Sequence, residues 1–186
     1  ILDFNITGEE GTVWLGNTTK LWFENDDWTN GHPTRRKIGL IPNGRPRYPW
    51  IYGEAESNIL TVEDSAYFVV RPQSTFTGYK TLYLNGTFNL CIHSNSTGTG
   101  SFMDLGGISG PGTAYVEQWV SDEKWHYTAS PISNGLSKTY LSLYLIPFIE
   151  GHNDWGNYIV PLDVQLPVMQ GFGVWSSATY PPMGDT

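Results

Sequence analysis

The feature that most constrains this chain is its series of short apolar runs separated by closely spaced turn residues. Most runs have four to eight residues, are rich in β-branched and aromatic types, and are bounded by Gly, Pro, Asn or Asp. This pattern is typical of β-strands. No segment sustains an apolar stripe of helical period over ten residues. The pattern therefore predicts about twelve strands and at most one or two single-turn helices.

The predicted fold class is all-β: an antiparallel β-sandwich or barrel of about twelve short strands, with little helix. The length predicts a single domain over residues 1–186. Asn85-Gly86 between two alternating runs predicts a hairpin over 79–93, and "SDEK" predicts a second hairpin between 113–120 and 124–129. Exposed strand edges need cover, so we expect a homodimer.

Charge and cysteine content narrow the partners. The net charge of −8 disfavours binding to phosphate backbones, so nucleic acid is not expected. No apolar run is long enough to span a bilayer, so no membrane insertion is expected. Cys91 is the only cysteine, which excludes an intrachain disulfide and suggests folding in a reducing compartment.

Signatures of catalysis and of metal binding are missing from the sequence. There is no HExxH, GxSxG, CxxC, P-loop or GxGxxG motif, and the four His residues are scattered. We therefore expect no enzyme, no catalytic residue, no cofactor and no metal. A glycosidase built on Glu54 or Glu117 stays open as a third alternative, because its two carboxylates would come from distant strands.

Aromatic side chains beside polar turn residues are the strongest sign of function. Three stretches have this character: "WFENDDWTNGH" (22–32), "RPRYPWIYGE" (45–54) and "EGHNDWGNY" (150–158). Trp and Tyr offer an apolar face with a polar tip, which suits both sugar rings and protein partners. A cluster of basic residues at 35–47 is either a solvated loop or a patch for an acidic ligand. The candidate binding residues are Trp28, His32, Arg35, Arg36, Arg45, Arg47, Trp50, Tyr52, His152, Asn153, Asp154, Trp155 and Tyr158.

The eight Trp residues divide into two expected groups. Trp14, Trp22, Trp119 and Trp125 fall within strand-like runs and are expected in the core. Trp28 and Trp155 fall among polar turn residues, so we expect both on exposed loops, as contacts for a receptor or glycan. Trp50 stands between two Tyr residues and is ambiguous.

The chain resembles the capsid spike of a small non-enveloped virus, and astroviruses are the nearest comparison. The resemblance rests on the acidic charge, the single Cys, the Ile at the start and the Trp-rich loops "WFENDDWTNGH" and "EGHNDWGNY". No family motif matches residue by residue, so no functional residue is carried over. The resemblance implies a dimeric domain on the virion surface that attaches the particle to a host-cell receptor and is bound by neutralising antibodies. It also implies that the sequons at Asn5, Asn17, Asn85 and Asn95 carry no glycans.

The main alternative is a bacterial adhesin, extracellular or on the cell surface, or a carbohydrate-binding module. A periplasmic adhesin more often has paired cysteines, whereas Cys91 stands alone. A β-sandwich glycosidase comes third.

Overall fold

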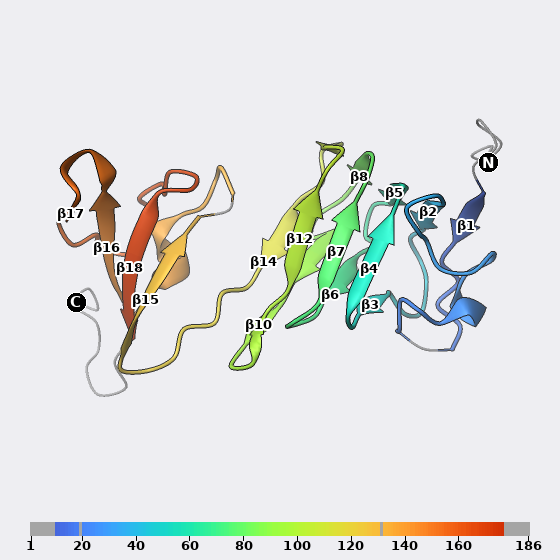
Figure 1. Cartoon of the computed structure of the whole chain (residues 1–186), viewed down its shortest axis with the longest axis horizontal. Helices are drawn as coiled ribbons and strands as arrows, with labels where there is room; N and C mark the ends of the chain where they lie inside the picture. Colours follow the sequence, from blue (N-terminus) through green and yellow to red (C-terminus); the bar gives the residue numbers. More distant parts are fainter. Residues whose placement is uncertain (1–9, 19, 131, 177–186) are drawn as a thin grey trace. The chain divides into compact units, whose positions relative to one another are not determined.

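The computed structural model describes residues 10–18, 20–130 and 132–176 (Figure 1). The chain divides into two compact units: the first ends at Trp119 and the second begins at Val120. The single domain over residues 1–186 that the length predicted stays a prediction, and each unit is described by itself. Each unit has its own buried core.

The first unit is a coil of short parallel strands. Its elements are β1 (Gly11–Val13), η1 (Asn25–Asp27, a 3-10 turn), β2 (Ile38–Ile41), β3 (Trp50–Ile51), β4 (Glu54–Ser57), β5 (Ile59–Val62), β6 (Phe68–Val70), β7 (Thr75–Gly78), β8 (Leu82–Leu84), β9 (Leu90–Ile92), β10 (Ser94–Asn95), β11 (Gly98–Thr99), β12 (Ser101–Asp104), β13 (Ile108–Ser109) and β14 (Ala114–Val116). They form three parallel sheets, in the orders β1-β2-β5-β8-β13, β3-β6-β9-β14 and β4-β7-β12. The small antiparallel pair β10–β11 is an insertion between β9 and β12.

Residues of the same kind stack from one turn of the coil to the next. Ile41 pairs with Val62, and Val62 pairs with Leu84 in the following turn. On another sheet, Ala55, Phe76 and Phe102 form a second such column. Because side chains alternate between the faces of a strand, one inward column per sheet fills the coil's core. This stacking makes the first unit a β-solenoid-like arrangement.

Three Trp residues close the N-terminal end of this core. Trp28 packs edge-on against Trp14 and Trp22, with ring centroids 5.1 Å apart in both pairs. The indole N–H of Trp28 donates to the carbonyl of Trp22 at 2.8 Å. Such edge-to-face pairs are favourable beyond the area they bury, so the cluster stabilises the end of the coil.

A buried Asn shapes one corner of the coil. The side-chain amide of Asn89 donates to the carbonyls of Glu63 and Ala66, and its oxygen accepts the N–H of Gly86. Asn89 is fully buried. It satisfies three backbone groups that would otherwise cost free energy in the interior.

The second unit is built on one antiparallel sheet. Its elements are β15 (Lys124–Ala129), η2 (Ser137–Tyr140), β16 (Tyr144–Ile149), η3 (Glu150–His152), β17 (Asp154–Trp155) and β18 (Gly171–Ser176), and the strand order is β15-β18-β16-β17 (Figure 1). One face of the sheet packs into the core through Leu145, Phe172 and Val174, together with Tyr140 and Leu166.

The structure confirms an all-β fold with 6% helix, but the antiparallel sandwich or barrel is wrong. Neither predicted hairpin forms. β8 pairs in parallel with β5 and β13, and β9 pairs in parallel with β6 and β14, so Asn85-Gly86 lies at a corner between two sheets. β15 pairs with β18, a distant strand, and not with the run at 113–120.

Among the described residues, no helix is long and apolar enough to cross a membrane. The sequon residues Asn17, Asn85 and Asn95 are exposed, and Asn5 lies outside the described residues.

Candidate functional site

The turn that carries "GHNDWGN" returns Trp155 to the sheet of the second unit. β16 runs into η3, and Asn153 then takes a left-handed conformation with φ of 51°. Asp154 begins β17, and its carboxylate accepts the N–H of Trp155 at 2.8 Å. β17 then pairs back on β16, with Trp155 opposite Phe148. The turn residues therefore aim one indole across the outer face of the sheet.

Aromatic rings cover that outer face in successive rows. Strand register aligns Trp125 on β15 with Trp175 on β18, and Trp175 with Tyr144 on β16. The next row aligns Tyr127 with Gly173, and Gly173 with Ile146. We call the set Trp125, Tyr127, Tyr144, Phe148, Trp155 and Trp175 the aromatic face.

Glycine at the centre of the sheet makes room for Trp155. A Cβ on Gly173 would lie 3.1 Å from Cζ3 of Trp155 and 3.1 Å from Cγ1 of Ile146. The indole therefore lies directly over the backbone of β18. The ring of Tyr127 is nearly parallel to it, with centroids 5.8 Å apart and planes 18° apart. Phe148 supports the same indole edge-on at 5.2 Å.

This face is open to solvent over much of its area. Trp125 is 49% exposed, Tyr127 78% and Trp155 39%. Trp and Tyr are enriched among the residues that contribute most to binding. The arrangement offers near-parallel π-faces on a sheet whose opposite side is packed in a core, so the rings are held on a firm support.

The predicted residues of the 150–158 stretch flank this face. His152, Asn153, Asp154 and Trp155 are exposed, as expected of a surface loop. Tyr158 is half-buried against Tyr144, with ring centroids 5.8 Å apart. Burial, followed by the neighbouring Tyr144, raises the pKa of the Tyr158 phenol, which favours its neutral form.

The expected exposure of Trp28 is wrong. It is 3% exposed and belongs to the Trp cluster at the end of the coil. Asp27 beside it is also buried, and its carboxylate accepts the N–H and the hydroxyl of Thr18. The polar residues around Trp28 thus form a turn over a buried ring, and Trp28 is no longer a candidate for ligand contact.

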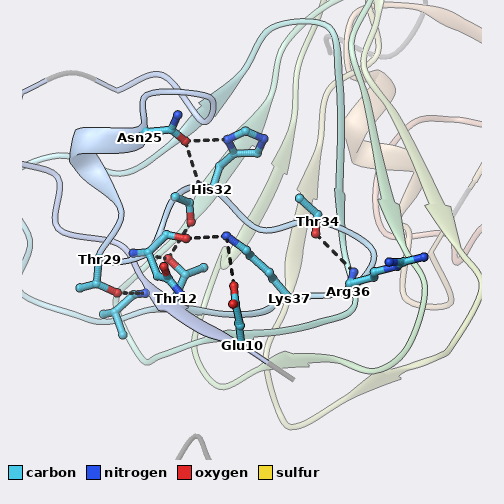
Figure 2. Close-up of polar contacts among 11 residues, drawn as sticks. Glu10, Thr12, Asn25, Thr29, His32, Thr34, Arg36 and Lys37 are labelled. Atoms are coloured by element: carbon cyan, nitrogen blue, oxygen red, sulfur yellow. Dashed lines mark hydrogen bonds and ion pairs between the residues drawn. The ribbon is translucent and has the colours of Figure 1, made fainter. Parts of the chain in front are cut away.

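His32 lies close to Trp28 in sequence but on the outside of the coil. Its Nδ1 lies 3.0 Å from the side-chain oxygen of Asn25 (Figure 2). Its ring meets Phe23 edge-on. Burial and then the charge of Lys37 lower the pKa of His32, against an opposing effect of Glu56. His32 also lines a hollow of about 310 Å³ over β4 and β7.

The basic stretch does not form one patch, because several of its side chains bind the protein itself. The guanidinium of Arg47 donates to the carbonyls of Asn17 and Thr18. Lys37 donates to the carbonyl of Asn30 and lies 3.8 Å from Glu10 (Figure 2). Arg45 is half-buried, whereas Arg35 and Arg36 are exposed. Only these last two retain the character of a solvated basic loop.

Trp50 and Tyr52 are engaged by cations of the same unit. Lys20 and Arg71 each lie 4.7 Å from the ring centroid of Trp50, and Arg71 lies 5.7 Å from that of Tyr52. Arg71 also bonds to Nδ1 of His93 at 3.0 Å. These cation–π contacts occupy the aromatic surface that a ligand would need.

Sequence reasoning missed most of the aromatic face. Trp125 was expected in the core, and Tyr127, Tyr144 and Trp175 were not proposed. Trp119, also expected in the core, is exposed, whereas Trp14 and Trp22 are buried as expected. The missed signal is alternation: Trp125 and Tyr127 are two residues apart, as are Gly171, Gly173 and Trp175, so each set shares one strand face.

No group of three or more His, Cys, Asp or Glu that could hold a metal occurs within the described part of the chain. No protein-family model matches the chain, and no curated protein or solved structure matches it either. The geometry of the aromatic face is therefore the basis for the functional proposal.

Proposed function

We propose that this chain is an attachment domain that binds a glycan through the aromatic face of its second unit. The observation that carries the proposal is the near-parallel pair Tyr127 and Trp155, which is exposed and whose indole packs against Gly173. The face of an aromatic ring is electron-rich, and the C–H groups on one side of a sugar ring are weakly positive, so the two attract. Because the aromatic residues follow one another across neighbouring strands, they can contact successive sugar units of an oligosaccharide.

Polar groups at the edge of the face add specificity to this stacking. Asn153, Asp154 and His152 are exposed on the turn beside Trp155 and offer donors and acceptors for sugar hydroxyls. Small-ligand sites often combine a mainly apolar surface with a few polar groups of this kind.

The charge of the second unit favours a neutral glycan over an acidic one. Between Val120 and Ser176 the acidic residues are Asp122, Glu123, Glu150, Asp154 and Asp163, and the basic ones are Lys124 and Lys138. This acidic excess repels sialylated or sulfated sugars, and it also repels nucleic acid, whose bases stack on aromatic rings.

The setting that we propose first is the virion surface, where a projecting domain attaches a small virus to a host-cell receptor and is exposed to neutralising antibodies. An adhesin or a carbohydrate-binding module is the alternative, and both use the same stacking chemistry. We propose binding and not catalysis. Of the glycosidase candidates Glu54 and Glu117, Glu117 is engaged within the protein, because its carboxylate accepts the N–H of Ser94 and lies 3.9 Å from His93.

A glycan array followed by calorimetry tests the proposal. We expect capture of at least one neutral glycan by the full chain. Tyr127→Ala and Trp155→Ala each remove a central ring, so each is expected to weaken binding about thirtyfold, equivalent to about 2 kcal/mol. Tyr83→Ala is the matched control, because Tyr83 is an exposed Tyr on β8 of the first unit.

Two results would contradict the proposal. Normal binding by both folded variants would place the contact surface elsewhere. If no glycan is captured, yet the chain binds cells and loses that binding in the two variants, then the receptor of the aromatic face is a protein.

A further inference from the structure

The first unit contains a hollow that plays no part in the proposed glycan site. Its floor is the outer face of β4 and β7, where strand register sets Glu54 beside Thr75 and Glu56 beside Thr77. Its wall comes from the chain preceding β2, and its volume is about 310 Å³, near the lower end for small-ligand sites. The wall and end residues are Phe23, His32, Pro33, Thr34 and Tyr79.

The hollow carries two carboxylates, Glu54 and Glu56, that form no ion pair among the described residues. Among the described residues, the ion pairs are Lys37–Glu10, His93–Glu117 and Lys138–Asp163, and none involves Glu54 or Glu56. One oxygen of Glu56 accepts the backbone N–H of Arg35 at 3.2 Å, which fixes the carboxylate without neutralising it. His32 adds no compensating charge near neutral pH, because burial and Lys37 lower its pKa.

Aromatic rings line the same hollow. Phe23 and Tyr79 are both exposed lining residues, at 39% and 38%. The lining therefore brings together carboxylates and aromatic rings, the two kinds of group that attract a cation. Elsewhere in the first unit, Lys20 and Arg71 make cation–π contacts with the ring of Trp50.

The lining favours an organic cation over a metal ion. A hard metal ion needs several oxygen ligands at short range, and no group of three His, Cys, Asp or Glu occurs among the described residues. An ammonium or guanidinium group instead presents several N–H donors, which match the carboxylates and the hydroxyls of Thr75 and Thr77. We propose that this hollow binds an alkylammonium or guanidinium group.

Two sources can present such a group: a basic side chain of a protein partner, or an amino sugar. Two pairs of probes distinguish them. The first pair is the peptide Gly-Lys-Gly, blocked by N-terminal acetylation and C-terminal amidation so that the lysine carries its only charge, and the same blocked peptide with the lysine Nε-acetylated. The second is the glucosamine trisaccharide and its fully N-acetylated form. Within each pair only the positive charge and its hydrogen bonds change substantially, so the neutral member controls for size and shape.

Amide chemical shifts of the isotopically labelled full chain report where each probe binds. We expect the charged member of at least one pair to shift the signals of β4 and β7 at concentrations up to about 10 mM, and the neutral member not to do so. Added salt is expected to weaken the effect because it screens the charges.

The variants that test the site are Glu54→Gln and the double change Glu54→Gln with Glu56→Gln. Both keep side-chain size, and Glu54→Gln alone leaves the bond from Arg35 to Glu56 intact. We expect at least a tenfold loss of affinity in the double variant and a smaller loss in the single one. Glu150→Gln, which removes one exposed carboxylate from the second unit, is the charge control and is expected to bind normally.

Several outcomes would overturn this inference. They are an absence of shifts in β4 and β7 with either charged probe, equal binding of charged and neutral members, and unchanged affinity in the double variant. Trp155→Ala separates the two sites, because loss of the aromatic face is expected to leave this binding unchanged. Failure of the glycan proposal would therefore leave the present one standing.

Discussion

Trp28 and Trp155 occupy similar polar sequence contexts but opposite environments, so the same substitution should have opposite effects. Trp28→Ala removes a ring packed between Trp14 and Trp22, and large-to-small changes of this kind cost about 3–5 kcal/mol in folding free energy. Trp155→Ala should change the free energy of unfolding by much less, because the ring lies on the surface. Urea unfolding of both variants measures the contrast. Equal destabilisation would contradict the assignment of Trp155 to an exposed face.

The local sequence did not separate these two residues, and the reason is physical. Asn, Asp and Thr around Trp28 predict a turn, and a turn does form there as η1. Whether a ring beside a turn points inward depends on what covers the end of the core, which neighbouring residues do not specify. For Trp155 the same turn signal coincided with an exposed ring.

At the residue scale, His32 is expected to make the folding stability depend on pH. Its pKa is lowered below the ordinary value of 6.5 by burial and by Lys37. The imidazole therefore binds a proton more readily in the unfolded chain than in the folded chain. As the pH falls through the ordinary pKa of 6.5, the free energy of unfolding therefore falls. We expect His32→Gln to narrow the difference in urea midpoint between about pH 7.5 and about pH 5. An unchanged difference would show that His32 does not contribute to it.

At the scale of the element, the glycines of β18 decide whether the aromatic face can form. A Cβ at 173 meets Trp155 and Ile146 at 3.1 Å, whereas a Cβ at 171 meets only Cβ of Phe148, at 3.7 Å. Gly173→Ala should therefore lift the indole from the sheet and weaken glycan binding several-fold, while Gly171→Ala should bind normally. Calorimetry with the captured glycan measures both, and near-ultraviolet dichroism reports the packing of the indole. Equal binding by both variants would argue against the role assigned to Gly173.

Strand-forming sequences were recognisable in this chain, but strand partners were not. β8 and β9 were both expected near their observed positions, and Asn85-Gly86 between them is a strong hairpin signal. In the structure Asn89 bonds to the backbone of Gly86, Glu63 and Ala66 and so turns a corner of the coil instead. That bond set links residues more than twenty positions apart, and no local pattern contains it.

At the scale of the whole molecule, the parallel coil escaped prediction because its turns differ in length. Successive partners Ile41, Val62 and Leu84 lie 21 and 22 residues apart, but Leu82 and Ile108 lie 26 apart because β10 and β11 are inserted. The repeat is carried by inward apolar positions alone, so the sequence shows no constant motif. Composition did predict the class, since β-branched and aromatic runs make strands in either direction.

The two ends of the coil differ in how they are covered, and this bears on the expected homodimer. The Trp cluster closes the first turn, whereas β12, β13 and β14 are all edge strands at the last turn. Ile108 ends the inward column that passes through Leu60 and Leu82, and it is 52% exposed where those two are buried. Open edges with apolar side chains tend to pair with another chain.

We therefore propose that a second copy covers this end, and we expect Ile108→Lys to shift sedimentation equilibrium from dimer toward monomer. The change places a charge where the partner's apolar surface would lie, which costs free energy on association but little in the exposed monomer. Tyr83→Lys is the matched control, because Tyr83 is exposed on the outer face of β8, one strand in from the edge strand β13. It should leave the dimer intact. A wild-type chain that stays monomeric at high micromolar concentration would rule out the homodimer, and a dimer unaffected by Ile108→Lys would place the interface elsewhere.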